Sequence, residues 1–357
     1  MKILIIINSL KPGGAEKQAV VDANALLQRG HQVTVAFHQY GEFNSLLDKD
    51  IKQYRIKKKN EILASFQLFC HLLFNKYDII HSHMFWAEKV STLPGKLTGH
   101  KLIFNEHGLG LWRKWYHILV MKFISIFADK IINSCDATKN IRLKREKINK
   151  YKLITVYNSF ELKTNKKDIG PLNQFSEDEK EFIIGFVGRF NYVKRLEFFL
   201  QIAEILKDKI AKFKIVMVGD GEESKKIKEE ILKRNLKNYF YIPGFVLNTA
   251  WYYNIFDIFV LPSIREAFSV SLLESGASGI TTIAFDVGGN SEIIKDGITG
   301  FIIPDGDIDL LVKRIVYLYE NPDKREMIGQ SAKEYISSNF SIDKRVINLE
   351  KLYKEIC

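Results

Sequence analysis

Short apolar segments with strand character alternate with helical segments along most of the chain, and this alternation constrains the fold more than any other feature. In the first half we predict strands at 2–8, 33–37, 79–81, 102–105, 130–133 and 151–157, with a helix over 15–29 that ends at Gly30. In the second half we predict strands at 182–187, 213–218, 239–242, 258–261, 282–285 and 300–303, and helices at 196–207, 222–234, 270–278, 291–295 and 309–320. Repeated strand–helix units form parallel sheets with right-handed crossovers, so the fold class is α/β.

A polar stretch at 163–180 separates the two rounds of alternation and is typical of a linker. The length of 357 residues also favours two domains. We predict an N-terminal domain over 1–162 and a C-terminal domain over 181–339, with a last helix over 340–357 that packs back on the first domain. Two doubly wound, Rossmann-like domains would face a central cleft, with ligands at the carboxyl ends of the strands.

The excess positive charge lies in the first half of the chain. Residues 1–160 hold 25 Lys and Arg against 12 Asp and Glu, an excess of +13, whereas residues 161–357 hold 28 against 30. Two basic runs, 52–59 and 142–152, stand out. They indicate a solvated surface, an anionic membrane surface or nucleic acid. Because no helix-turn-helix, RRM or zinc-finger pattern is found in the sequence, we expect no nucleic-acid partner.

The segment 111–132 places Trp112, Arg113, Lys114, Trp115 and Tyr116 ahead of an apolar helix. Such a mixture suits a membrane interface, although a core helix with an exposed basic start would have the same sequence. With the charge of this half, it favours reversible contact with an anionic bilayer. No run reaches 18 apolar residues and no signal peptide is recognised, so we expect a cytoplasmic protein, peripheral at the inner face of the membrane.

The three cysteines are far apart in the sequence, at Cys70, Cys135 and Cys357. This sparse set argues against a disulfide framework or a zinc site and fits a reducing compartment.

Three motifs follow predicted strands and carry chemistry. Gly13 and Gly14 precede the first helix, where free N–H groups attract anions, but the pattern is neither GxGxxG nor a P-loop. Gly188-Arg189, with Lys194 shortly after, places two cations where a diphosphate could bind, or forms an ordinary basic surface. The stretch from Glu266 to Glu274 puts one carboxylate in a loop and another in the following helix, which suits a sugar nucleotide, although the spacing alone is weak evidence.

In their order along the chain, these motifs resemble those of family GT4, the retaining glycosyltransferases with the GT-B fold. The similarity covers roughly residues 2–305, and the first glycine loop is similar to that of bacterial enzymes that extend surface polysaccharides, lipopolysaccharide cores or lipid-linked oligosaccharides. The matching segments are Gly13-Gly14-Ala15-Glu16, Asp78 to His83, Glu106-His107-Gly108, Val156-Tyr157-Asn158, Gly188-Arg189 with Lys194, Val218 to Gly221, Glu266 to Glu274 (the family's E-x7-E), and Asp286 to Glu292 ending in Gly297 to Gly300.

The resemblance implies a role for each matching residue. Arg189 and Lys194 would hold the donor diphosphate, Glu274 the ribose hydroxyls and Glu266 the donor sugar. His107 would lie near the transferred sugar and act with Arg189, Lys194 and Glu266 in catalysis. The remaining substrate-binding positions are Gly13 and Gly14 near the diphosphate and acceptor, Gly188, the backbone at Gly244, Phe245 and Val246 for the base, and Phe268, Ser269 and Val270 for the phosphates and sugar.

The expected activity is retaining transfer of a hexose or N-acetylhexosamine, with a UDP-sugar favoured and GDP-mannose left open, to a lipid-linked or surface glycan. Fixed positive groups would stabilise the leaving diphosphate, so we expect neither a metal nor a cofactor. The run Glu266-Ala267-Phe268-Ser269 departs from the family's usual Glu-Gly-Phe-Gly, and the two larger side chains could narrow the sugar pocket. The alternatives are a sugar-nucleotide epimerase of similar shape and a non-catalytic glycan-binding protein.

Two further patterns could suggest metal ligands. Asp305-Gly306-Asp307 has DxD spacing but follows a predicted strand in a polar turn, where we expect a solvated loop. His81 and His83 lack a third ligand nearby in the sequence and are expected to be structural histidines at a strand end.

Overall fold

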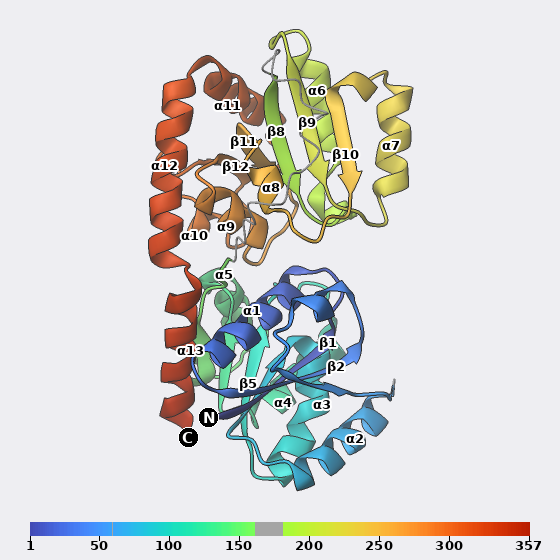
Figure 1. Cartoon of the computed structure of the whole chain (residues 1–357), viewed down its shortest axis with the longest axis vertical. Helices are drawn as coiled ribbons and strands as arrows, with labels where there is room; N and C mark the ends of the chain where they lie inside the picture. Colours follow the sequence, from blue (N-terminus) through green and yellow to red (C-terminus); the bar gives the residue numbers. More distant parts are fainter. Residues whose placement is uncertain (59, 161–180) are drawn as a thin grey trace. The chain divides into compact units, whose positions relative to one another are not determined.

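A computed structural model describes residues 1–58, 60–160 and 181–357, so the predicted linker at 163–180 lies outside the described residues. The chain divides into two compact units (Figure 1). Unit 1 consists of Met1–Ser159 together with Phe340–Cys357, and unit 2 of Phe160–Asn339.

Unit 1 is built on a parallel sheet of seven strands in the order β3-β2-β1-β4-β5-β6-β7. The strands are β1 (Lys2–Ser9), β2 (Gln32–Gln39), β3 (Lys52–Arg55), β4 (Ile79–His83), β5 (Lys101–Glu106), β6 (Lys130–Asn133) and β7 (Leu153–Thr155). The central β1 is a continuous apolar run because helices cover both faces of the sheet. β3 is not among the predicted strands, because an edge strand with polar residues does not stand out as an apolar run.

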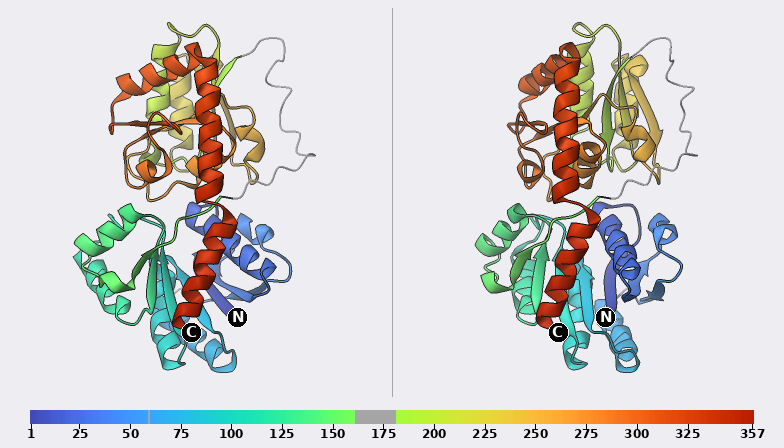
Figure 2. Two further views of the ribbon diagram at one scale, coloured as in Figure 1. Left: turned by 90° about the vertical axis from the view of Figure 1, so that its left-hand side faces the viewer. Right: turned by 60° about the vertical axis from the view of Figure 1, so that its left-hand side comes forward.

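Two layers of helices cover the sheet of unit 1. Helices α1 (Gly14–Gln28) and α13 (Ile342–Ile356) share one core with the sheet, and they lie side by side in Figure 2. The other core includes α2 (Glu61–Phe74), α3 (Met84–Leu97) and α4 (Trp115–Ser125). Helix α5 (Asp136–Lys144) contacts β6 and β7.

A buried ion pair fastens α13 to this unit. The Arg345 guanidinium donates to both carboxylate oxygens of Asp22 on α1, at 2.6 and 2.7 Å. It also donates to the backbone carbonyls of Val156 and Tyr157, at 3.0 and 2.8 Å. The terminal helix is therefore part of the first unit, although it follows the second in sequence.

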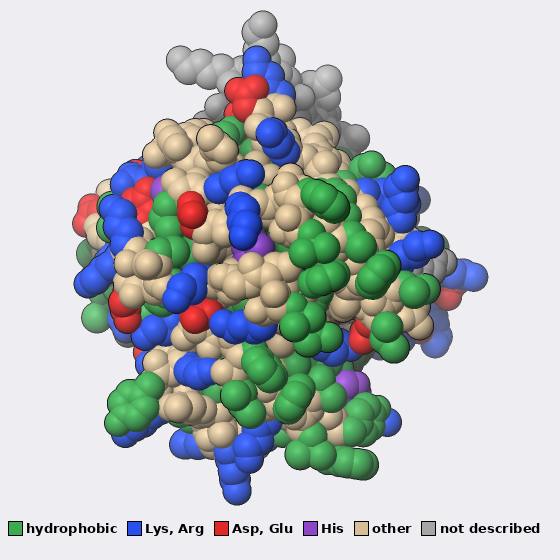
Figure 3. Space-filling view, turned by 90° about the horizontal axis from the view of Figure 1, so that it is seen from below, with side chains coloured by type: hydrophobic (Ala, Val, Ile, Leu, Met, Phe, Trp, Pro, Cys, Tyr) green, Lys and Arg blue, Asp and Glu red, His purple; other side chains and the backbone are tan. Residues whose placement is uncertain are grey.

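The outward side chains of α2 and α4 are unusually apolar. Large hydrophobic residues of both helices are exposed, including Phe66, Phe74, Trp115 and Phe123. Figure 3 shows apolar side chains gathered on one face of the molecule, with lysine and arginine among them and few acidic groups. No helix in the part of the chain that the structure describes has the length and apolarity needed to cross a membrane.

Unit 2 is a second parallel sheet, of six strands in the order β10-β9-β8-β11-β12-β13. The strands are β8 (Phe182–Val187), β9 (Phe213–Val218), β10 (Phe240–Gly244), β11 (Ile258–Leu261), β12 (Thr281–Phe285) and β13 (Phe301–Ile303). Its helices are α6 (Glu197–Leu206), α7 (Ser224–Lys233), α8 (Ala250–Tyr253), α9 (Val270–Ala277), α10 (Asn290–Ile293), α11 (Ile308–Glu320) and α12 (Pro322–Asn339). The predicted α/β class with two Rossmann-like parallel sheets is confirmed.

Candidate active site

The candidate site of unit 2 lies where the strand order reverses, between β8 and β11. Ligands of open parallel sheets bind outside the carboxyl ends of strands at such a point. The loop after β8 carries Arg189 and Lys194, and the loop after β11 carries Glu266. The two loops are joined by a hydrogen bond from the backbone N–H of Ile264 to the carbonyl of Val193, at 2.8 Å.

Lys194 and Glu266 meet directly. The ammonium Nζ lies 2.5 Å from the carboxylate Oε1, and their side chains are only 16% and 12% exposed. Partial burial strengthens the attraction between the two charges relative to a pair in open solvent. The structure therefore brings together two residues that the sequence assigns to different parts of the donor.

Arg189 points elsewhere. Its side chain is 67% exposed, and its Nε lies 3.7 Å from Glu222 Oε2. An exposed pair of this length adds little stability. The Arg189 guanidinium is thus accessible to a ligand at the end of β8.

The DxD pattern is accounted for by local contacts. Asp305 forms an ion pair with Arg195, which has a left-handed backbone with φ +47°. Asp307 caps α11, accepting from the N–H of Leu310 at 2.9 Å.

Glycines let the backbones around the site approach one another closely. Gly219 has φ +145°, and a Cβ there would lie 1.9 Å from the carbonyl oxygen of Gly188. Gly288 has φ +57°, and a Cβ there would lie 1.6 Å from the carbonyl oxygen of Glu266. Only glycine allows both the positive φ angle and the close approach to these carbonyl oxygens. The Gly219 and Gly288 segments therefore support the loops that carry Arg189 and Glu266.

Glu274 lies on α9 and is buried. The hydroxyl of Tyr253, on α8, donates to its Oε2 at 2.9 Å. Burial and the Glu274 carboxylate raise the pKa of the Tyr253 hydroxyl, which therefore keeps its proton and remains a donor. Sequence reasoning missed Tyr253, because nothing in the spacing links α8 to α9.

The remaining predicted positions of unit 2 surround α9 and the end of β10. Phe268 and Ser269 are buried before Val270, where α9 begins, and the Ser269 hydroxyl lies 3.0 Å from that of Ser271. Gly244 ends β10 with φ +87°, and its carbonyl accepts from Gly219 N–H at 2.9 Å. Phe245 is exposed and Val246 half-buried beyond it.

In unit 1 the predicted positions follow β1 and β5, which are separated in the sheet by β4 alone. Gly13 and Gly14 start α1 after β1, and His107 comes directly after β5. The intervening strand β4 ends at His83, whose Nδ1 lies 2.9 Å from Nε2 of His107. His83, which the sequence predicts to be a structural histidine at a strand end, contacts the predicted site histidine.

The histidines of this edge are held neutral. Burial lowers the pKa of His107 to about 4 and that of His81 to about 3, and it also lowers the pKa of His83. The Tyr353 hydroxyl on α13 lies 2.8 Å from Nδ1 of His81. Neutral imidazoles have one donor and one acceptor nitrogen, so His83 and His107 can share one proton between their facing nitrogens.

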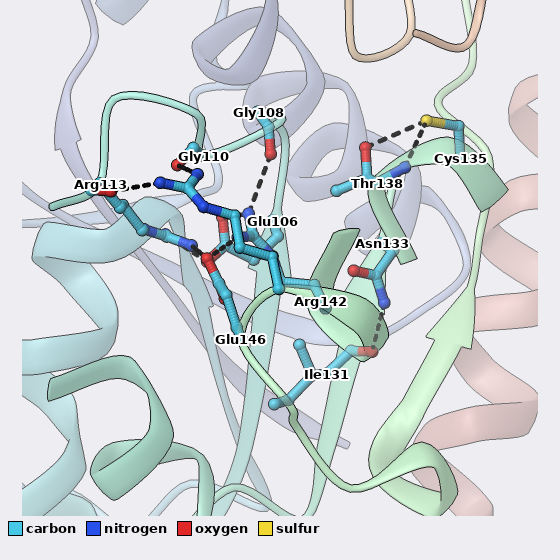
Figure 4. Close-up of polar contacts among 11 residues, drawn as sticks. Glu106, Gly108, Gly110, Arg113, Ile131, Asn133, Cys135, Thr138, Arg142 and Glu146 are labelled. Carbon is cyan, nitrogen blue, oxygen red and sulfur yellow. Dashed lines mark hydrogen bonds and ion pairs between the residues drawn. The ribbon is translucent and has the colours of Figure 1, made fainter. Parts of the chain in front are cut away.

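A buried charge cluster holds the loop after His107 (Figure 4). Arg113 donates to Glu106 at 2.5 Å and to Glu146 at 3.0 Å. Arg142 contacts Glu146 and donates to Glu106 and to the carbonyl of Gly108, both at 2.9 Å. The interpretation of the basic run 142–152 as surface charge is wrong for Arg142, which is fully buried. The expectation of an exposed basic segment before the apolar helix is wrong for Arg113, which is also buried. Sequence reasoning missed this cluster because Glu106 lies on β5, far from Arg142 in sequence, although the i,i+4 spacing of Arg142 and Glu146 was a local signal.

Two sequence families match the chain. The model described as "Glycosyltransferase Family 4" matches residues 12–163, and the model described as "Glycosyl transferases group 1" matches residues 172–335. Together they span most of both units.

Among solved structures, Anabaena Alr3699/HepE in complex with UDP and glucose is similar, with a TM-score of 0.88 and 21% identity over 99% of this chain and 100% of that one. The fold is thus the GT-B fold, as predicted.

Curated relatives agree with these matches. The UDP-Gal:alpha-D-GlcNAc-diphosphoundecaprenol alpha-1,3-galactosyltransferase of Escherichia coli is 24% identical over 99% of this chain and 97% of its own. The capsular polysaccharide biosynthesis glycosyltransferase CapM of Staphylococcus aureus is 25% identical over 79% of this chain and 78% of its own. The chain belongs to the family 4 glycosyltransferases.

Proposed function

We propose that this protein is a retaining glycosyltransferase that moves a hexose or N-acetylhexosamine from a UDP-sugar to a lipid-linked or surface-polysaccharide glycan. The observation that carries the proposal is the grouping of Lys194, Glu266 and Arg189 on two bonded loops at the switch point of unit 2. The names of the similar proteins support the substrate classes, since one uses UDP-Gal with a diphosphoundecaprenol acceptor and another makes capsular polysaccharide.

The donor side is assigned to unit 2. Arg189 and Lys194 bind the diphosphate, and the carboxylate of Glu274 accepts hydrogen bonds from the ribose hydroxyls. Backbone groups at Phe268, Ser269 and Val270 contact the phosphates and sugar, and those at Gly188 and at Gly244, Phe245 and Val246 contact the phosphate and base. When the diphosphate arrives it replaces Glu266 as the partner of Lys194, which leaves the Glu266 carboxylate for the sugar hydroxyls.

The chemistry follows from these charges. Cleavage of the bond between the anomeric carbon and the phosphate puts negative charge on the diphosphate and positive charge on the sugar. Lys194 and Arg189 stabilise the first charge once the diphosphate is bound, and one fixed donor of this kind contributes about 3–4 kcal/mol. Because protein cations supply this charge, we propose that the reaction needs no metal.

The acceptor side is assigned to unit 1, with Gly13, Gly14 and His107 after the carboxyl ends of β1 and β5, the two strands that flank β4. A neutral His107 accepts or donates a hydrogen bond to a sugar hydroxyl without adding charge. A lipid-linked acceptor would place the protein at the cytoplasmic face of the membrane.

The test is release of UDP from a panel of UDP-sugars with and without a lipid-linked acceptor, with the product linkage read by NMR. Lys194→Ala should abolish transfer. Lys214→Ala is the matched control, because Lys214 is 21% exposed and lies 3.5 Å from Glu181 on the same unit. Equal loss in both variants, or full activity of Lys194→Ala, would refute the assigned role.

Other outcomes would replace the proposal. An epimerised sugar nucleotide without UDP release indicates an epimerase, and glycan binding without turnover indicates a binding protein. Loss of transfer in EDTA would show that the metal-independent mechanism is wrong.

A further inference from the structure

Helices α2 and α4 expose rows of large apolar side chains where a helix of a globular protein is usually polar. On α4, Trp115, Leu119 and Phe123 are four residues apart, so they form one row along the helix, and all three are exposed. On α2, Ile62 is 79% exposed and Phe74 is 86% exposed. Both helices, with α3, cover the same side of the sheet. We call the outward side chains of α2 and α4 the apolar face.

Positive charge accompanies the apolar face. From residue 107 to residue 128 the chain has no Asp or Glu, and because Arg113 is buried its exposed cations are Lys114 and Lys122. Residues 62–77 also contain no acidic residue. Lys114 and Lys122 are exposed, and within the described residues neither ammonium group forms an ion pair. Exposed Lys57 and Lys58 precede α2. Unpaired lysines around apolar side chains attract an anionic surface.

At one end of each helix, side chains of this protein form hydrogen bonds with the backbone groups that the helix leaves without a partner. At the end of α4, the Lys152 ammonium donates to the carbonyls of Ser125, Ile126 and Ala128, at 3.0, 2.5 and 2.8 Å. At the start of α2, the side chain of Asn60 accepts from the N–H groups of exposed Ile62 and Leu63, at 2.9 and 3.3 Å. Free backbone groups are costly in contact with hydrocarbon, so these contacts make the apolar ends suitable for insertion.

We propose that the apolar face docks on the surface of an anionic lipid bilayer, with α2 and α4 lying in the interface and their apolar rows inserted between the headgroups. Interfacial helices of this kind combine Trp, Phe and Leu on one face with Lys near the headgroups. Trp and Tyr are favoured at the headgroup level, and Trp115 and Tyr116 lie at the start of α4. The docking surface is inferred from the apolar face itself. The inference rests on the proposed function only where it states what docking achieves, which is access to a lipid-linked acceptor.

The test is co-sedimentation of the full chain with vesicles of phosphatidylcholine alone or with phosphatidylglycerol. Wild-type protein should bind the anionic vesicles and bind the neutral ones weakly. Trp115→Gln with Phe123→Gln should reduce partitioning about tenfold or more, because each large side chain contributes to insertion. Phe66→Gln with Phe74→Gln tests α2 in the same way, and Lys114→Gln with Lys122→Gln should weaken binding to the anionic vesicles alone.

Matched controls are Leu232→Gln on α7 of unit 2 and Ile347→Gln on α13, which change exposed apolar residues that are not part of the apolar face and should bind as wild type does. Circular dichroism and UDP-induced thermal shifts on every variant report folding and donor binding without lipid. Loss of UDP binding with normal vesicle binding therefore contradicts the proposed function and not the docking surface.

Three results would overturn the docking proposal. They are no vesicle binding by the wild type, equal binding to neutral and anionic vesicles, and equal binding by the controls and the apolar-face variants. A dimer in sedimentation velocity that the apolar-face variants disrupt, without vesicle binding, would show that the face joins two copies of the chain.

Discussion

The buried cluster of Arg113, Arg142, Glu106 and Glu146 makes a stability prediction that can be worked from its contacts. Arg142→Met keeps the length of the side chain but removes a guanidinium that contacts both glutamates and the Gly108 carbonyl. Two buried carboxylates then face the single guanidinium of Arg113. Removing one partner of a buried ion pair costs about 3–5 kcal/mol.

This cost has a measurable thermal consequence. For a unit of this size, 1 kcal/mol corresponds to about 2–4 °C in the melting temperature. Arg142→Met should therefore lower the unfolding transition of unit 1 by roughly 6–20 °C. Differential scanning calorimetry measures the shift, and tryptophan fluorescence identifies the unit, because three of the four Trp residues lie in the first 120 residues.

A matched control separates burial from charge. Lys130→Met removes a cation that lies 3.0 Å from Glu355, whose side chain is 55% exposed, and exposed pairs contribute at most about 1 kcal/mol. The double variant Arg142→Met with Glu146→Gln should recover part of the loss, because one buried carboxylate and not two then faces Arg113. If Arg142→Met and Lys130→Met lower the transition equally, the cluster does not have the energetic role inferred from its burial.

Three other predictions concern protons, donor binding and loop support. His107 has its pKa lowered to about 4, whereas an unfolded histidine titrates near 6.5, so the unfolded chain binds more protons between these values and the free energy of unfolding decreases as pH falls from 6.5 to 4. His107→Asn should make this slope shallower by up to about 1.4 kcal/mol per pH unit, as measured by urea unfolding, and an unchanged slope would contradict it. Tyr253→Phe removes the donor to buried Glu274 and should raise KM for the UDP-sugar about tenfold with little change in kcat, whereas a purely structural role would lower stability without that selective change. Gly288→Ala should lower kcat/KM at least about tenfold, because the new Cβ would displace the Glu266 backbone. Gly297→Ala is the control: at φ +72° it introduces backbone strain, but no atom lies within 4 Å of the added Cβ, so this variant should retain activity.

Much of the fold could be predicted because buried parallel strands are apolar throughout. The runs at 182–187, 213–218 and 258–261 coincide with β8, β9 and β11. Edge strand β3 and helix α12 could not be recognised in this way. β3 lies at the edge of the sheet and is largely exposed, so its sequence is polar. Helix α12 buries only Ile328, Gly329, Ala332 and Ile336 along its 18 residues.

Part of the candidate site could also be predicted from the sequence, and part could not. The motifs single out Arg189, Lys194 and Glu266 because these residues lie in loops after predicted strands, and Glu274 because it lies in the helix that follows. Their roles remain predictions. Their partners are set by tertiary packing, so neither the contact of Tyr253 with Glu274 nor that of His83 with His107 could be inferred from spacing. Charge runs are ambiguous for the same reason, since the sequence does not show whether a basic residue is solvated or buried against a glutamate.

The buried cluster also bears on how the positive charge of the first half should be interpreted. Two arginines face two glutamates inside unit 1, so the net charge of the cluster is zero. The cluster therefore does not change the excess positive charge of +13 in residues 1–160. Glu88, buried close to Glu106, has its pKa raised by burial and by that neighbour, which favours its uncharged form and increases the excess. The excess must therefore be carried by groups outside the cluster, among them the exposed lysines beside α2 and α4. An anionic surface meeting unit 1 at those helices would meet positive charge and apolar side chains together, whereas a neutral protein partner would use only the second.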